Sequence, residues 1–311
     1  MTQPATPGPD SSHWVHREPL AGDASSRRYE RLRQGDGSTA VLAEYPADAR
    51  PTMDRDLEVL HWFLQTGLRV PSVMGHDLEA GWIILEDLGE EDAEGRLRRT
   101  PDSERRPLVQ AALAPLSVLA PIEVDTLPPW NPALDGHRMR WELAGFELWY
   151  LVHHLAGRPS ERLDAWFDDL ATEVAAHPVR ICHRDYHLNN LFFLPTGEAA
   201  MIDVQDVLVG PDTYDAVSLL EERAMGELVT AEERLLLRQA WAETTGATDG
   251  WEARWSRVRL QRALKVVGTF ARLDACGRPG YRPWMQGLTA DLVAEADRLE
   301  LPGELVDLLL D

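Results

Sequence analysis

The 311-residue chain has two cysteines, Cys182 and Cys276, and a single lysine, Lys265, among its 31 basic residues. Two cysteines are too few for a disulfide framework, and neither has the spacing of metal ligands. A long apolar run is also lacking, because the stretch from 111 to 122 is short and contains Pro115, which argues against a membrane span. The N-terminus has no basic start and no apolar segment. We therefore expect no signal peptide and a cytoplasmic protein.

Positive charge is scarce. The formal net charge is −21, and no basic footprint for a phosphate backbone is evident, so we expect no nucleic-acid partner. An acidic surface favours solubility and also permits a cationic substrate. Hydrophobic residues (44%) and charged residues (27%) occur at ordinary globular levels, and the length allows two lobes. The sequence carries no signal for an oligomeric state.

The first 88 residues predict a small antiparallel sheet with one inserted helix. Residues 1–13 are rich in Pro, Ser and Thr and are expected to be flexible. From residue 14, strand-like segments flank turn signals such as Gly35-Asp36-Gly37-Ser38. A predicted helix lies between two of these strand-like segments. It carries Leu57, Leu60 and Leu64 on one face and ends near Gly67. We assign residues 14–88 to one lobe.

Residues 89–311 predict a second, mainly helical lobe. The Arg-rich segment 89–107 is expected to be a surface connection. Beyond it, apolar stripes, a capping box that opens at Thr230 and the long pattern 251–273 indicate helices. A strand–loop–strand island, residues 180–204, interrupts them. The predicted fold class is therefore α+β.

The island carries the chemistry. Residues 183–190 read HRDYHLNN, which contains the H-R-D-x-x-x-x-N pattern of kinase catalytic loops, and Asp203 ends the apolar strand that follows. Phosphoryl transfer needs a carboxylate to accept the proton of the substrate hydroxyl, and oxygen ligands for the magnesium ions that bridge the phosphates. Asp185 fits the first role, and Asn190 and Asp203 fit the second. Each of them alone could be a turn or strand-end cap; the spacing of all three favours the catalytic interpretation.

The form His-x-Asp-x-His-x-x-Asn, with the later segment GPDTYDAVSL (210–219), resembles the aminoglycoside phosphotransferase and choline kinase superfamily. The segments GDASSRRY (22–29), LEDLG (85–89), IDVQD (202–206) and FELWY (146–150) narrow the resemblance to the bacterial anomeric N-acetylmuramate/N-acetylglucosamine kinases of cell-wall recycling. The resemblance extends from about residue 20 to about residue 285. It implies a bilobal, protein-kinase-like fold, in which residues 14–88 cover the nucleotide and residues 89–311 form the catalytic and substrate lobe. It also implies ATP and Mg²⁺ as cofactors, and a brace from Asp215 to the catalytic loop.

The same resemblance implies which residues hold the nucleotide. The turn that ends in Ser25 and Ser26 would be the phosphate loop, with Arg27 and Arg28 at its edge. The strand end that includes Glu86 and Leu88 would contact adenine.

One kinase feature is missing, because the third strand, VLAE (41–44), lacks the lysine that pairs with ATP phosphates. Lys265 is too far downstream to replace it. An arginine is the predicted substitute, and strand alternation favours Arg27 over Arg28. Glu58 lies roughly where such kinases keep a helix glutamate, and it fits an exposed helix position equally well.

Each candidate substrate residue also has a structural explanation. Glu142 and Glu147 are candidates for contacts to sugar hydroxyls, and Trp149 is a candidate for stacking on a sugar ring; an exposed helix face and a core position explain them equally well. Gln205 and Asp206 are candidates for the acceptor site, and a loop-capping role explains them equally well. The leading hypothesis is a kinase for a small amino sugar. Another hydroxyl compound, such as an aminoglycoside, is the second candidate. The third is a nucleotide-binding pseudokinase, which the missing lysine favours and the intact Asp185, Asn190 and Asp203 disfavour.

Overall fold

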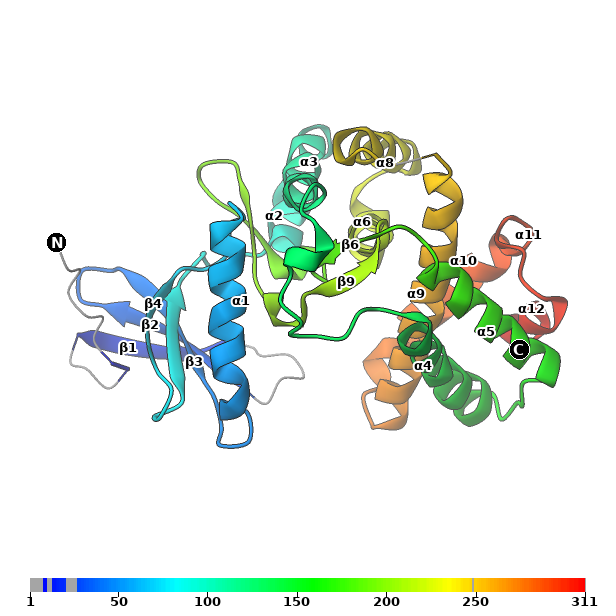
Figure 1. Ribbon diagram of the computed structural model, residues 1–311, viewed down its shortest axis with the longest axis horizontal. Coiled ribbons are helices and arrows are strands. Elements are labelled where there is room, and N and C mark those ends of the chain that lie inside the picture. The colour runs from blue at the N-terminus through cyan, green and yellow to red at the C-terminus, as the bar shows by residue number, and fades with distance from the viewer. Residues whose placement is uncertain (1–7, 10–12, 21–26, 248, 311) are drawn as a thin grey trace. The chain divides into compact units, whose positions relative to one another are not determined.

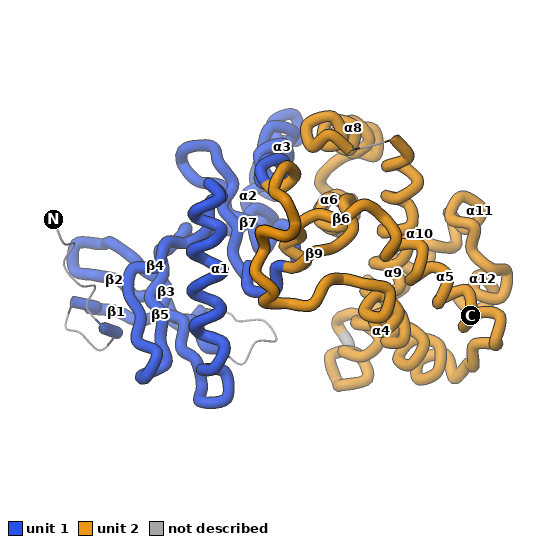
Figure 2. Tube along the Cα trace, in the orientation of Figure 1, with its two compact units in different colours: residues 1–118, 185–207 blue, residues 119–184, 208–311 orange. Residues whose placement is uncertain are grey.

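The chain divides into two compact units (Figure 2). The structure is a computed structural model that describes residues 8, 9, 13–20, 27–247 and 249–310. Unit 1 comprises residues 1–118 and 185–207, and unit 2 comprises residues 119–184 and 208–311. The segment that begins at Asp185 therefore packs with the N-terminal part of the chain.

Unit 1 contains a five-stranded antiparallel sheet in the order β1-β2-β3-β5-β4 (Figure 1). The strands are β1 (Trp14–Pro19), β2 (Arg28–Gln34), β3 (Thr39–Glu44), β4 (Val73–Asp77) and β5 (Trp82–Glu86). The turn between β2 and β3 forms as predicted. Asp36 accepts hydrogen bonds from Ser38, and Gly37 has a φ of 90°, which favours glycine.

Helix α1 (Met53–Gln65) packs on this sheet through a face that includes Leu57 and Leu60 of the predicted one. The buried residues are Met53, Asp56, Val59, Leu60 and Phe63, whereas Leu64 is exposed. The prediction was wrong at Leu64 and did not include Met53, Val59 and Phe63, which share the buried face with Leu60. The carboxylate of Asp56 is buried on the same apolar face.

The segment 89–107 is not a loop, so that prediction was wrong. Helix α2 (Ala93–Arg99) begins after Asp92, whose side chain accepts from the N–H of Gly95, and α3 (Asp102–Leu119) follows. Arg and Glu have good helix propensity, and Glu94 and Arg98 form an ion pair at the i,i+4 spacing. A hairpin, β7 (Leu191–Phe193) with β8 (Ala199–Met201), completes the regular structure of unit 1.

Unit 2 is mainly helical, as predicted, with β6 (Val179–Cys182) paired to β9 (Leu208–Pro211). Its helices are α4 (Gly136–Phe146), α5 (Glu161–Ala175), α6 (Tyr214–Leu220), α7 (Arg223–Leu228), α8 (Ala231–Thr245), α9 (Trp251–Ala275), α10 (Arg282–Ala294), α11 (Ala296–Leu299) and α12 (Gly303–Leu310). A π-helix, Glu147–His154, continues α4. The predicted capping box at Thr230 is present. Helix α9 is central, because it packs against α4, α5, α6 and α10.

The crossing of α9 and α4 depends on Gly268. A Cβ at this position would lie 2.6 Å from both the Cα and the N of Phe146, and backbone atoms cannot move aside as a side chain can. We expect Gly268→Ala to destabilise the protein by about 1–3 kcal/mol, the usual cost of overpacking, which lowers the Tm by several degrees. The control is Gly287→Ala inside α10, where nothing lies within 4 Å of the new Cβ. Equal Tm values for the two variants would contradict this packing.

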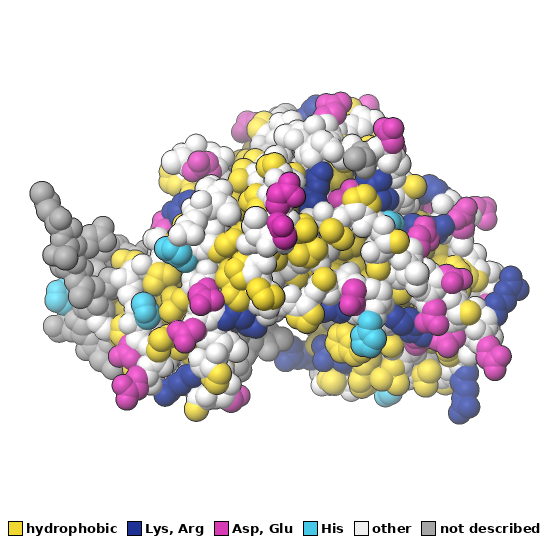
Figure 3. Space-filling model, viewed as in Figure 1, with side chains coloured by type: hydrophobic (Ala, Val, Ile, Leu, Met, Phe, Trp, Pro, Cys, Tyr) yellow, Lys and Arg dark blue, Asp and Glu magenta, His cyan; other side chains and the backbone are white. Residues whose placement is uncertain are grey.

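Acidic and basic side chains are interspersed on the face shown in Figure 3, where no basic stripe gathers. Within the described ranges, no helix combines the length and the apolar character needed to cross a membrane.

Candidate active site

The predicted catalytic loop follows β6. Immediately before Asp185, the backbone N–H groups of His183 and Arg184 donate to the carboxylate of Asp215 on α6, at 2.6 and 3.0 Å. Burial raises the pKa of Asp215, and these two donors partly offset that effect. Arg184 adopts a φ of 80°, a conformation that costs a non-glycine residue energy. Asp215 therefore takes the bracing role that the resemblance implied.

Asp185 itself is half-buried, and the loop after it is anchored within unit 1. The hydroxyl of Tyr186 donates to the carbonyl of Ala112 at 2.6 Å, and Tyr186 is fully buried. The side-chain amide of Asn190 donates to the backbone carbonyl of Asp185 at 2.9 Å. These bonds hold the backbone at Asp185 and Tyr186 in place.

The hairpin of β7 and β8 brings Asn190 and Asp203 to the same end. The N–H of Ile202 donates to the carbonyl of Asn190 at 2.9 Å, so Asp203 follows directly beside Asn190. Asp203 has a φ of 62°, and its side chain is 42% exposed. Aspartate adopts this left-handed conformation more readily than most residues.

These two residues fit magnesium chemically. Because the Nδ2 of Asn190 is turned toward the loop, its Oδ1 and the Asp203 carboxylate are the oxygens available to a hard cation. In the described ranges, no group of three or more His, Cys, Asp or Glu side chains could hold a metal. Two protein oxygens suit Mg²⁺, which commonly keeps waters and is shared with substrate phosphates.

Arg27 and Arg28 differ as strand alternation predicts. Arg28 is exposed. The side chain of Arg27 is 13% exposed; its Nη1 lies 3.1 Å from the Asp56 carboxylate and its Nη2 lies 3.8 Å from that of Asp203. Of the two arginines, Arg27 is thus the one beside the predicted metal ligand.

The other predicted nucleotide residues are placed as follows. Ser25 and Ser26 lie outside the described residues. Glu86 ends β5 and pairs with Arg69 while accepting from Ser72; these bonds lower its pKa against the opposing effect of burial. Leu88 is half-buried just beyond that strand.

The predicted substrate residues belong to several different environments. Glu142 is buried on α4, where it pairs with Lys265 at 2.9 Å and accepts from Gln261 at 3.0 Å. Glu147 pairs with Arg140, which also holds Asp164 and Asp168 of α5. Trp149 is half-buried, with its ring centroid 5.6 Å from that of His153. Gln205 donates to Asp203, and Asp206 follows in the same 3₁₀ turn, Val204–Asp206.

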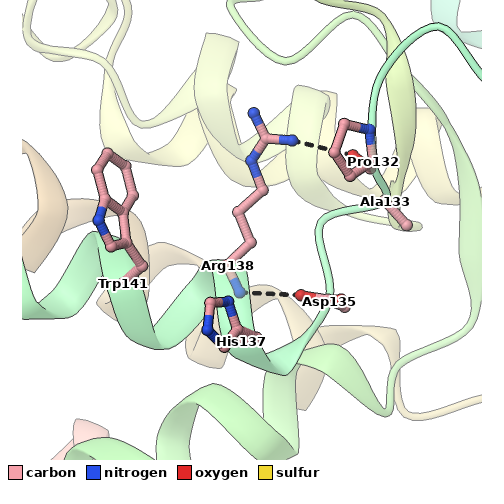
Figure 4. A pocket seen from close by; sticks show the side chains of 6 residues that line it. All are labelled: Pro132, Ala133, Asp135, His137, Arg138 and Trp141. Atoms are coloured by element: carbon pink, nitrogen blue, oxygen red, sulfur yellow. Dashed lines mark hydrogen bonds between the residues drawn. The ribbon is translucent and has the colours of Figure 1, made fainter.

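A shallow pocket lies in unit 2 beside the start of α4 (Figure 4). Arg138 donates to the carbonyl of Pro132, and its backbone N–H donates to Asp135. Trp141, which is 69% exposed, forms part of the lining. None of the predicted substrate residues lines this pocket, and Trp141 was not considered a candidate.

The sequence analysis also missed Asp56 and Tyr45. The hydroxyl of Tyr45, at the end of β3, donates to Asp56 at 3.0 Å. A signal was present: Asp56 follows Met53 by three residues and precedes Phe63 by seven, so it shares their helix face. An aspartate on an apolar face needs a buried partner. Glu58, the earlier helix candidate, is exposed.

Known proteins place the chain in a family. Residues 16–260 match the phosphotransferase enzyme family. The N-acetylmuramate/N-acetylglucosamine kinase of Pseudomonas aeruginosa is 32% identical over 277 residues, which cover 85% of this chain and 78% of that protein. The kinase of the same name from Neisseria meningitidis serogroup B is 29% identical and covers 85% of this chain and 80% of that protein.

Solved structures agree on the fold. Choline kinase LicA from Streptococcus pneumoniae has a TM-score of 0.59 at 12% identity and covers 90% of this chain and 95% of that chain. Amicoumacin kinase in complex with AMP-PNP, Ca²⁺ and Ami has a TM-score of 0.58 at 14% identity, and the match covers 86% of this chain and 87% of that chain. The predicted α+β kinase-like fold is confirmed. The chain belongs to the phosphotransferase enzyme family and is a phosphotransferase with an alcohol group as acceptor.

Proposed function

We propose that this phosphotransferase uses ATP and magnesium to phosphorylate the anomeric hydroxyl of N-acetylmuramate or N-acetylglucosamine in the recycling of cell-wall sugars. The observation that carries the proposal is the sequence similarity to the P. aeruginosa kinase, which is named for both sugars. That similarity covers 85% of this chain. The proposal includes a cytoplasmic location, because the cytoplasm supplies the ATP that the reaction needs.

In this mechanism, Asp185 accepts the proton of the anomeric hydroxyl as its oxygen attacks the γ-phosphorus of ATP. The products are a sugar 1-phosphate and ADP. The bonds that Asp215 and Asn190 make to the loop backbone hold the carboxylate in place, so little reorganisation is needed during the reaction. Asn190 and Asp203 would hold Mg²⁺, which would neutralise charge on the phosphates.

The nucleotide and sugar contacts are assigned from the placements above. Arg27 would contact the phosphates, since it is the cation beside Asp203. The end of β5, Glu86 to Leu88, would face adenine. Asp206 and Gln205, which follow Asp203, are the proposed acceptor-site residues, and Trp149 remains the proposed stacking surface. Glu142 and Glu147 would act from within their ion pairs, by orienting neighbouring groups.

An ADP-release assay with a panel of acceptors tests the substrate. We expect turnover with N-acetylmuramate or N-acetylglucosamine. We expect none with the methyl glycoside of the same sugar, because its anomeric oxygen has no proton to give. Phosphorylation of the methyl glycoside, seen by phosphorus NMR, would move the transfer to another hydroxyl. Turnover with an aminoglycoside alone would favour the alternative to which the net charge of −21 points.

A further inference from the structure

A buried acid on α1 contacts the cation of the proposed nucleotide site. We propose that Asp56 is a positioning residue that aims the guanidinium of Arg27 at the nucleotide phosphates, and that Tyr45 holds Asp56 in place. This proposal rests on the proposed use of ATP. It assigns a task to two residues that neither the motifs nor the comparisons identify.

The surroundings of Asp56 fit this task. Its Oδ2 accepts from the Nη1 of Arg27 at 3.1 Å and from the hydroxyl of Tyr45 at 3.0 Å, and its Oδ1 lies 3.4 Å from Arg55. The Asp56 side chain is 6% exposed. Burial raises its pKa, which the cation and the hydroxyl partly counteract. A buried carboxylate on an apolar helix face is tolerated only when it is paired in this way.

The side chain of Arg27 is held on several sides. Asp56 contacts one terminal nitrogen, and the aromatic rings of Tyr29 and Tyr45 have centroids 5.9 and 5.7 Å from the guanidinium carbon. The second terminal nitrogen lies 3.8 Å from Asp203. A planar guanidinium can use separate nitrogens for separate partners, which the compact ammonium of a lysine does less well. Asp56 thereby presents the other nitrogen of Arg27 toward the metal ligand.

In this arrangement Arg27 supplies the cation that a lysine on β3 supplies in other kinases. The cation comes from the residue before β2, and the acid comes from α1, 29 positions further along the chain. The neighbouring candidates, Arg28 and Glu58, are both exposed, whereas Arg27 and Asp56 lie largely buried.

The test compares Asp56→Asn with Asp54→Asn, an exposed aspartate on the same helix. Calorimetry would measure binding of AMP-PNP with magnesium and, separately, of AMP, which lacks the outer phosphates. We expect Asp56→Asn to weaken AMP-PNP about tenfold or more and AMP less than twofold, with Asp54→Asn unchanged. In a double-mutant cycle, Arg27→Ala with Asp56→Asn should bind AMP-PNP no more weakly than Arg27→Ala alone.

Wild-type affinity for AMP-PNP in a folded Asp56→Asn protein would overturn the proposal, as would fully additive effects of the two substitutions or an equal loss for AMP. If Asp56→Asn does not fold, Tyr45→Phe decides: a selective loss for AMP-PNP supports the proposal and unchanged binding overturns it. Failure of the wild-type protein to bind AMP-PNP would instead refute the proposed function.

Discussion

Asp185→Asn is expected to lower turnover by about 10²-fold or more, because general-base catalysis contributes about 10²–10⁴. The substitution removes the proton acceptor and keeps the size of the side chain. The loop should keep its shape, because neither of its two anchoring bonds uses the Asp185 carboxylate. Asn190 donates to the backbone carbonyl of Asp185, and the hydroxyl of Tyr186 donates to the carbonyl of Ala112. Steady-state kinetics with saturating sugar and ATP would measure the effect.

Two controls separate chemistry from folding in this variant. The Tm and the affinity for AMP-PNP with magnesium should both stay close to those of the wild type. Near-full turnover in Asp185→Asn would remove this residue from the role of base. A large loss of stability would show that the carboxylate has a structural task that its half-buried position does not reveal.

Asp203→Ala is expected to abolish most of the magnesium-dependent affinity for nucleotide, with a loss of at least about 10–100-fold, since even the outer-shell partners of metal ligands contribute that much. Asn190→Ala should act in the same direction. The two side chains project from one end of the β7–β8 hairpin and offer hard oxygen atoms. Binding of AMP-PNP, titrated with and without magnesium, would measure the effect.

The comparison without magnesium is the informative control, because a metal ligand matters only when the metal is present. In chelator, Asn190→Ala should bind nucleotide like the wild type. Unchanged affinity in the presence of magnesium, in both variants, would place the metal site elsewhere. Asp203→Ala also removes the carboxylate beside Arg27, so its effect in chelator reports on that contact separately.

Local spacing alone allowed a catalytic loop to be proposed from the sequence. The spacing from His183 to Asn190 lies within one short segment, and a strand-ending aspartate needs no knowledge of distant residues. The β2–β3 turn and the capping box at Thr230 were predictable for the same reason, since both depend on neighbours within a few positions.

Long-range pairs were not predictable from pattern alone. Whether Glu142 faces a substrate or a partner depends on Lys265, which lies more than a hundred residues away on α9. The pairing of Arg27 with Asp56 likewise joins residues 29 positions apart, which no local pattern connects. Segment 89–107 was taken for a loop because its many arginines were interpreted as surface polarity, although arginine also favours helices.

The most direct test of the account follows the oxygen atom that is phosphorylated. N-acetylglucosamine or N-acetylmuramate labelled with ¹⁸O at the anomeric position would be incubated with the enzyme, ATP and magnesium, and the product examined by phosphorus NMR. The account predicts a sugar 1-phosphate whose phosphorus signal carries the isotope shift of a bridging ¹⁸O. A phosphate ester without the label, or no phosphorylated sugar from either substrate, would contradict it.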